Sequence, residues 1–180
     1  MANRIIDCCS LINLYTGWRG LHELQALGHT WYVAEAALKE AQYTRDVGEG
    51  GRLVTIALRL DDLVQSGELN RAAAETAEEM ELYVELSAEL DDGEAEALAI
   101  AKARGLILLT DDAKAIEVAH RPQLSVQTLS TVNVLQEWLS SDPSLENRAH
   151  EVVRRIETLA RFRPRIGTDE FEWWMAIRGQ

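Results

Sequence analysis

The sequence predicts a three-layer α/β/α domain in which helices cover both faces of a parallel sheet. Two short segments, residues 4–7 and 106–110, are mostly apolar runs of strand length, as in strands that are buried on both faces. Segments with the apolar spacing of helices lie between and after them. Because strands and helices alternate in this way along the chain, a parallel sheet between two layers of helices is the expected arrangement.

The first half of the chain begins with a strand that ends in an acid, followed by a helix that Ser10 can cap. Leu21, Leu24 and Leu27 continue the helical spacing up to the stop signal Gly28. A segment rich in β-forming residues then precedes a run of strong helix formers, and a Gly-rich stretch breaks the pattern. We expect strands at 4–7 and 29–34, helices at 10–27, 35–43, 53–66 and 72–90, and a loop at 47–51.

The second half repeats the alternation of helices and strands. Gly105 stops an Ala-rich helix, and a continuous apolar run follows it directly. A Ser-Asp-Pro sequence that includes Pro143 ends the last helix of this pattern. We expect helices at 94–104, 111–119 and 131–141, and strands at 106–110 and 124–130. These elements predict a core domain over residues 1–141, and residues 142–180 are expected to form a helical extension and tail.

Composition and cysteine usage narrow the class of protein. The chain has 180 residues, 47% of them hydrophobic, which is enough for one domain with a core and an extension. It contains no run of about eighteen apolar residues, and its first residues lack the apolar stretch of a signal peptide. Cys8 and Cys9 are expected on opposite faces of one strand, so they predict neither an intrachain disulfide nor a zinc site. We therefore expect a cytoplasmic protein without a membrane span.

The charge is strongly negative and unevenly distributed. Thirty acids against eighteen bases give a net charge of −12, which repels nucleic acid in general. The simplest explanation is a solvated, soluble surface. The bases nevertheless cluster, because residues 143–165 carry six arginines against three glutamates. The distribution of charge therefore matters more than its sum, and it allows some acids to converge on a cation while the bases gather elsewhere.

Acidic residues stand at the ends of two expected strands and at the start of a helix. Asp7 ends the first strand, Asp111 and Asp112 follow the strand at 106–110, and Glu94 begins a helix. Ligands of open parallel sheets bind beyond the carboxyl ends of the strands. Each acid alone is more simply explained as a helix cap or as a charge that complements the helix dipole. Converging carboxylates, however, would repel one another unless a divalent cation held them, so together they point to a metal site.

Two motifs resemble the signature of the PIN-domain family. The segment IIDCCSLINLYTG is similar to the family's opening motif, an Asp at the end of the first strand followed by a small polar pair and an apolar helix. The segment DDGEAEALAIAKARGLILLTDDAKA is similar to the second half of the signature, in which an acid opens a helix and a later strand ends in Thr and Asp. The resemblance covers roughly residues 4–140, and the GEAEAL form is closer to a prokaryotic subgroup of PIN proteins, related to VapC-type toxins, than to the best-known VapC toxins.

The resemblance implies four catalytic acids. Asp7 matches the first, and Glu40 matches the second, which family members carry on the helix after the second strand. The third is Glu94 or Glu96, and we favour Glu94 because it opens its helix and has the better spacing to the Thr-Asp-Asp motif. The fourth acid matches Asp112.

Neighbouring positions complete the implied site. Asp111 competes with Asp112 for the role of the fourth acid, and both are candidate metal ligands together with Asp7 and Glu94. Thr110 matches the family's polar residue beside the metal, where it would contact the substrate. Position 9 departs from the family pattern, since a cysteine stands where many members have Ser or Asn, but this departure leaves the carboxylate set intact.

The implied activity is hydrolysis of phosphodiester bonds in single-stranded RNA by carboxylate-held Mg²⁺ or Mn²⁺. Oxygen ligands suit these hard cations, and the metal would also offset the repulsion between an acidic pocket and a polyanion. The resemblance further suggests the toxin of a type II toxin–antitoxin pair, with RNA as substrate, an antitoxin protein as partner and a homodimer as the assembly. One alternative is a non-catalytic PIN-like scaffold that has lost its metal. A phosphoacceptor of the response-regulator type is disfavoured, because no Lys follows the strand expected at 124–130.

The tail has two interpretations. Apolar residues at helical spacing over 144–161, with arginines between them, predict a helix that the chain leaves after Pro164. In the first interpretation, this helix and the pair Trp173–Trp174 pack back onto the core or across a dimer. In the second, the arginines form an RNA-guiding surface, with Arg154 and Arg155 as phosphate contacts.

Overall fold

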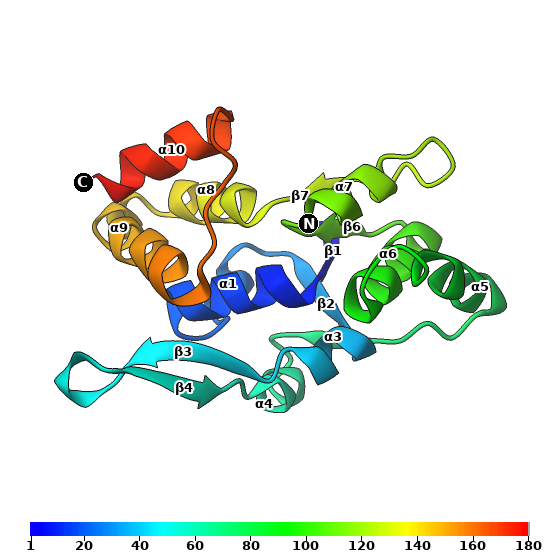
Figure 1. Cartoon of the computed structure of the whole chain (residues 1–180), viewed down its shortest axis with the longest axis horizontal. Coiled ribbons are helices and arrows are strands. Elements are labelled where there is room, and N and C mark those ends of the chain that lie inside the picture. The colour runs from blue at the N-terminus through cyan, green and yellow to red at the C-terminus, as the bar shows by residue number, and fades with distance from the viewer. Residues whose placement is uncertain (180) are drawn as a thin grey trace.

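The central sheet confirms the predicted fold class. The computed structural model describes residues 1–179, and its main sheet has five parallel strands in the order β5-β2-β1-β6-β7 (Figure 1). Helices flank this sheet on both faces, which gives the three-layer α/β/α architecture. The first strand along the chain lies at the centre of the sheet. The strands are β1 (Asn3–Ile6), β2 (Thr30–Ala34), β5 (Asn70–Ala72), β6 (Ile107–Leu109) and β7 (Thr128–Leu129).

Most helices lie where the apolar spacing placed them. The helix expected at 131–141 begins and ends at those residues, because Ser130 and Asn133 form a reciprocal capping box at its start. The α-helices of residues 1–179 are α1 (Cys8–Trp18), α2 (Glu23–Ala26), α3 (Glu35–Glu40), α4 (Leu60–Gln65), α5 (Ala77–Leu86), α6 (Asp92–Arg104), α7 (Ala113–Ala119), α8 (Thr131–Ser141), α9 (Glu146–Arg155) and α10 (Asp169–Arg178). Short 3-10 helices, η1 (Glu49–Gly51) and η2 (Pro143–Leu145), and a π-helix, η3 (Ile156–Ala160), complete the set.

A β-hairpin replaces part of a predicted helix. The expectation of a helix over 53–66 was wrong for its first residues, because β4 (Leu53–Ala57) pairs antiparallel with β3 (Tyr43–Val47). The segment LVTIA is rich in β-branched residues, and the Gly-rich stretch before it supplies the tight turn of the hairpin. The helix expected at 35–43 ends earlier, at Glu40, where β3 begins shortly afterwards. The hairpin extends away from the main sheet beneath α1 in Figure 1.

The segment 72–90 also differs from its prediction. Its first residue belongs to β5, a short strand at the edge of the sheet, and the helix begins only at Ala77. The start of this helix is set by a capping box between Thr76 and Glu79. In this box, the side chain of each residue accepts a hydrogen bond from the backbone N–H of the other, so the first N–H groups of the helix have partners. Strand pairing with β2 supplies the backbone partners of residues 70–72.

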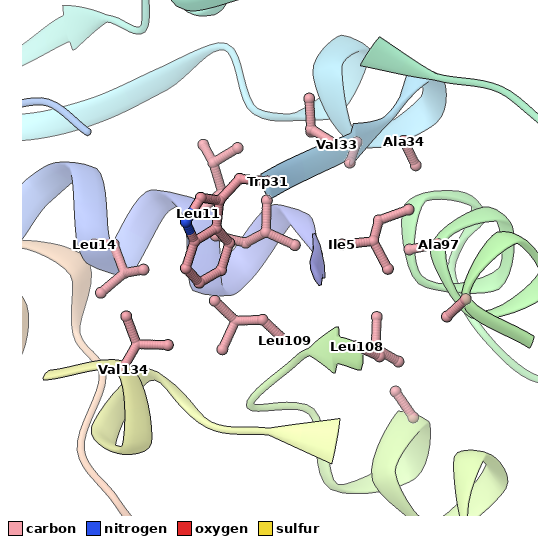
Figure 2. Close-up of a cluster of buried hydrophobic side chains, with 14 of the residues drawn as sticks. Ile5, Leu11, Leu14, Trp31, Val33, Ala34, Ala97, Leu108, Leu109 and Val134 are labelled. Atoms are coloured by element: carbon pink, nitrogen blue, oxygen red, sulfur yellow. The ribbon is translucent and has the colours of Figure 1, made fainter. Parts of the chain in front are cut away.

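The hydrophobic core fills both sides of the sheet. Leu108 and Leu109 are neighbours on β6 and point to opposite faces, one toward α6 and the other toward α1 and α8 (Figure 2). Trp31 and Trp138 are almost completely buried, as their strand and helix patterns predict, and each indole N–H donates a hydrogen bond, to Leu24 O and to Glu23 Oε2 respectively. The sheet is therefore held rigidly beneath its carboxyl edge.

The C-terminal extension packs against the body through α1. Helix α9 and the π-helix η3 contact α1, and Gly17 permits this approach, because a Cβ at that position would lie 2.9 Å from Ile156 and Val152. Trp174 on α10 is fully buried and meets Phe162 edge to face at 5.6 Å. The interpretation in which the tail packs back onto the core is thus correct for α9 and for Trp174.

Candidate functional site

Asp7 is a fully buried acid at the carboxyl edge of the sheet. It follows β1 and caps α1, where its Oδ1 accepts a hydrogen bond from the Ser10 backbone N–H at 2.7 Å. Its Oδ2 is buried and has no hydrogen-bond partner. Burial raises the pKa of this carboxyl from 3.8 to about 6, although Ser10 and the neighbouring Thr110 hydroxyl act in the opposite direction. Such an oxygen is costly unless it meets a proton or a cation.

Glu94 lies in the first turn of α6 and approaches Asp7 from a different segment. Burial, and then the charges of Asp112, Asp7 and Asp91, raise the pKa of Glu94 from 4.5 to about 7. Because the effect of one charge on another group's pKa falls with distance, Asp7 and Asp112 lie near Glu94, although the three acids come from different parts of the chain.

Asp112 caps α7 with one oxygen and keeps the other free. Its Oδ1 accepts hydrogen bonds from the backbone N–H groups of Lys114 and Ala115, both at 2.8 Å. Among the residues that the structure describes, none donates a hydrogen bond to Oδ2. The cap therefore fixes the carboxylate in place and leaves one oxygen able to bind a ligand.

Asp111 is engaged at both of its oxygens. Its Oδ1 accepts from the Thr131 backbone N–H at 2.8 Å, and its Oδ2 accepts from Asn13 Nδ2 at 3.0 Å, Ser10 Oγ at 3.3 Å and the Thr131 hydroxyl. Burial raises the pKa of Asp111, and these donors oppose the rise. Asp111 thus ties α1 and α8 to the end of β6. Of the two adjacent aspartates, Asp112 has the freer oxygen.

Glu40 and Glu96 occupy different positions from those of the central acids. Glu40 ends α3, and its Oε1 accepts a hydrogen bond from the Gly93 backbone N–H at 3.1 Å, just before Glu94. A Cβ at Gly93 would lie 2.6 Å from Glu40 Oε2, so only glycine allows this contact without a shift. Glu96 is buried, and its two oxygens accept from Ala36 N at 2.7 Å and from the N–H of residue 74 at 3.2 Å. Glu96 therefore ties α6 to the first turn of α3 and to the loop after β5, whereas Glu94 lies near Asp7 and Asp112.

Cys8 and Cys9 lie in the first turn of α1, not in a strand as expected. The charges of the neighbouring acids affect the pKa values of both thiols. The pKa of each thiol is raised to about 12. Burial is the largest cause for both, and the charges of Asp7 and Glu94 act on both as well. Both thiols stay protonated at neutral pH, so neither serves as a nucleophile.

The carboxylates fit a divalent cation by their chemistry, although they are not drawn tightly together. No three His, Cys, Asp or Glu side chains in residues 1–179 lie close enough to hold a metal ion as they stand. The unpartnered, buried Oδ2 of Asp7 and the raised pKa values of Asp7 and Glu94 nevertheless mark a place where positive charge would be stabilised. Oxygen-only ligands suit Mg²⁺ or Mn²⁺.

The two arginines expected to contact phosphates lie in different surroundings. Arg155 is mostly buried, where its Nε donates to Thr16 O and its guanidinium pairs with Asp46, both at 3.0 Å. These contacts fix the hairpin to α1, so the Arg155 guanidinium is already engaged. Arg154 is exposed and borders a shallow cleft with Val47 of the hairpin. Thr110, the expected substrate contact, is fully buried, and its hydroxyl accepts from the Asp112 N–H at 3.1 Å.

Sequence reasoning missed the polar residues that hold Asp111. Ser10 and Asn13 stand three and six residues after Asp7, so they share a face of α1, and this spacing was a usable signal for one side of the site. Thr131 lies at the start of α8, and nothing in the sequence connects it with Asp111. The hairpin, with Arg45 on β3, was missed together with its strands.

The fold and the acidic edge together define an α/β protein with a carboxylate site at the ends of its parallel strands. A family model described as a PIN domain matches residues 3–163. The chain therefore belongs to the PIN-domain family, as the motifs indicated. PIN domains are generally nucleases, they generally bind RNA, and they typically use divalent metals. No protein among those with curated functions matches the chain. Among residues 1–179, no helix is both long enough and apolar enough to span a membrane.

Proposed function

We propose that this protein is a metal-dependent endoribonuclease that cleaves phosphodiester bonds in single-stranded RNA. The observation that carries the proposal is the placement of Asp7, fully buried with an unpartnered Oδ2, at a sheet edge that Glu94 and Asp112 also face. Membership of the PIN-domain family supports the reaction class.

Each acid has a distinct part in this proposal. Asp7, Glu94 and Asp112 would hold the cation, with Oδ2 of Asp7 and Oδ2 of Asp112 as the free oxygens. When bound, the metal polarises the scissile phosphate and neutralises the charge that develops on it. Asp111 keeps α1 and α8 in position around the site, and Glu40 holds the start of α6, from which Glu94 extends.

The test is cleavage of an end-labelled single-stranded RNA in the presence of Mg²⁺ or Mn²⁺. We expect Asp7→Asn and Glu94→Gln to lower the rate by a factor of about a hundred or more, as loss of a ligand's charge would. Asp92→Asn, the same change at an exposed residue of α6, is the matched control and should retain activity. Full activity of pure Asp7→Asn protein would refute the assignment of cleavage to this carboxylate site, and absence of cleavage by the unmodified protein with either metal would favour a non-catalytic scaffold.

A second readout does not depend on cleavage. Mn²⁺ binding stabilises the folded state by mass action, by about 2.7 kcal/mol at a concentration one hundred times the dissociation constant. We expect Mn²⁺ to raise the melting temperature of the unmodified protein at neutral pH and to have little effect on Asp7→Asn. An equal rise for both proteins would place the metal elsewhere.

We further propose that the nuclease acts as the toxin of a toxin–antitoxin pair in the cytoplasm. The finding that supports this finer role is the family membership alone. The neighbouring reading frame is the decisive observation, because a small partner with a basic or DNA-binding segment should be encoded there. Growth arrest on expression of the chain, relieved by that partner and absent for Asp7→Asn, is the expected result.

A further inference from the structure

A cleft of about 350 Å³ lies between the hairpin and the π-helix, on the α1 side of the acidic edge. Arg45 on β3 and Arg161, directly after η3, line it from opposite sides, together with Tyr43, Thr55 and Ile12. Within residues 1–179, no carboxylate lies within ion-pair distance of either guanidinium. In a protein with a net charge of −12, two arginines that line one cleft without acid partners favour the binding of an anion there.

The backbone of Arg161 is set by the end of the π-helix. Its φ of 62° places it in the left-handed region, where it ends the π-helix and its backbone N–H donates to Ile156 O. A non-glycine residue in this region costs about 1–2 kcal/mol, and glycine would make the same turn without that cost. Arg19 ends α1 in the same conformation, so this backbone geometry belongs to the turn, and it holds Arg161 at the end of the π-helix beside the cleft.

The hairpin wall of the cleft is anchored. Arg155 pairs with Asp46 and donates to Thr16 O, and the hydroxyls of Thr16 and Thr44 share a hydrogen bond. Because these contacts attach β3 to α1, Arg45 is presented on a fixed strand opposite Thr55. A preorganised cation loses less entropy when it binds a ligand than one on a mobile loop.

The cleft adjoins the acidic site along α1 and along the C-terminal segment. Ile12 stands one helical turn, about 5.4 Å, beyond Cys8, whose thiol is subject to the charges of Asp7 and Glu94. On the other side of Arg161, the next residues, from Phe162 to Arg165, border a second cleft that includes Asp111. Helix α1 and the segment after η3 therefore each border both the arginine cleft and the neighbourhood of the acids.

We propose that Arg45 and Arg161 bind a backbone phosphate of the RNA one or a few nucleotides away from the bond that is cut. This inference rests on the proposed nuclease function and adds a binding subsite to it. Guanidinium groups donate paired hydrogen bonds to phosphate oxygens, and the exposed ring of Tyr43 is placed to stack on a base without selecting its identity. The hairpin thus supplies the positive charge that the acidic body lacks.

The test measures binding of a fluorescent single-stranded RNA by anisotropy, in an Asp7→Asn background without added metal. Each phosphate contact contributes about 0.7 to the slope of log affinity against log salt concentration for single strands. Because the two arginines share one phosphate, we expect Arg45→Gln and Arg161→Asn together to lower the slope by about 0.7, and each alone to lower it by a smaller amount. Asn tolerates the left-handed conformation, so Arg161→Asn removes the charge without adding strain.

The matched control is Arg52→Gln, the same loss of charge on the same hairpin but outside the lining of the cleft. Its slope should equal that of the parent. Unchanged slopes for both cleft variants, an equal decrease for Arg52→Gln, or no RNA binding by the parent would overturn the cleft proposal. If cleavage depends on Asp7 but the slopes do not change, the nuclease proposal stands and the cleft proposal fails. If the slopes fall but cleavage does not depend on Asp7, the cleft proposal stands and the proposed active site fails.

Discussion

The buried carboxylate of Asp7 should make the protein less stable as the pH rises from 4 to 7. In the unfolded chain this acid titrates at its ordinary pKa of 3.8, whereas burial raises the pKa in the folded protein to about 6. Between these values the folded state holds a proton that the unfolded state has lost, so the free energy of unfolding falls with rising pH. The penalty is absent below the unfolded value and complete above pH 6.

Asp7→Asn removes this penalty and keeps the cap of α1. The amide oxygen can still accept the hydrogen bond from the Ser10 N–H, and an uncharged group replaces the unpartnered oxygen. The difference between 3.8 and about 6, converted at about 1.4 kcal/mol per pKa unit, corresponds to roughly 3 kcal/mol of added stability at pH 7. Near pH 4 the two proteins should differ little, since the carboxyl is then largely protonated in the folded state.

Urea unfolding followed by tryptophan fluorescence at pH 4 and pH 7, without divalent metal, measures the effect. Asp92→Asn, on the exposed side of α6, controls for the change in net charge. A stability difference between parent and Asp7→Asn that is the same at both pH values would refute the reasoning, as would a variant that is less stable at pH 7. Added Mn²⁺ at pH 7 should reduce the advantage of the variant, because only the parent keeps its ligand.

Three other variants test the scaffold around the site. Glu96→Gln should lower the free energy of unfolding by about 1–3 kcal/mol, because it disturbs two partly buried hydrogen bonds. Glu94→Gln should not lower it. Equal effects of the two changes in urea unfolding would contradict the separation of their roles. Gly93→Ala should destabilise the folded protein by about 1–3 kcal/mol, since its Cβ would clash with the Glu40 carboxylate. An unchanged melting temperature would show that the Glu40 side chain can move away without cost. Arg155→Gln should loosen the hairpin, so amide hydrogen exchange should become faster over residues 43–57 and stay unchanged in the main sheet. The same change in exchange rate in the hairpin and in the main sheet would argue against the anchoring role of Arg155.

The parallel sheet could be predicted because its strands are defined by local patterns. The short apolar runs around Ile5 and Leu108 are typical of strands buried on both faces, and the acids that follow them mark the carboxyl edge. The hairpin could not be recognised from apolar spacing alone, since its strands are largely exposed and carry no alternation between a buried and a solvated face. Its β-branched residues and Gly-rich turn were the usable features, and they were given too little weight.

The site was predicted as a set of positions but not as a set of roles. Sequence patterns located Asp7, Glu94, Asp111 and Asp112 near the same edge, because strand ends and helix starts meet there. They could not distinguish Asp111 from Asp112, since that distinction depends on donors that fold in from α1 and α8, such as Thr131. Hydrogen bonds between residues far apart in the chain have no local sequence pattern.

The central place of β1 in the sheet imposes an order on synthesis and folding. Its neighbours are β2, made soon after it, and β6, whose residues follow Ala34 only after about seventy more have been added. At a synthesis rate of about 5–20 residues per second, one edge of β1 waits roughly 4–15 s for its partner. During that time its backbone groups are open to pairing with other chains, and the acids cannot assemble, because Asp112 has not yet been made. We therefore expect a nascent chain of this protein to lack its acidic edge and to be prone to aggregation until β6 is in place.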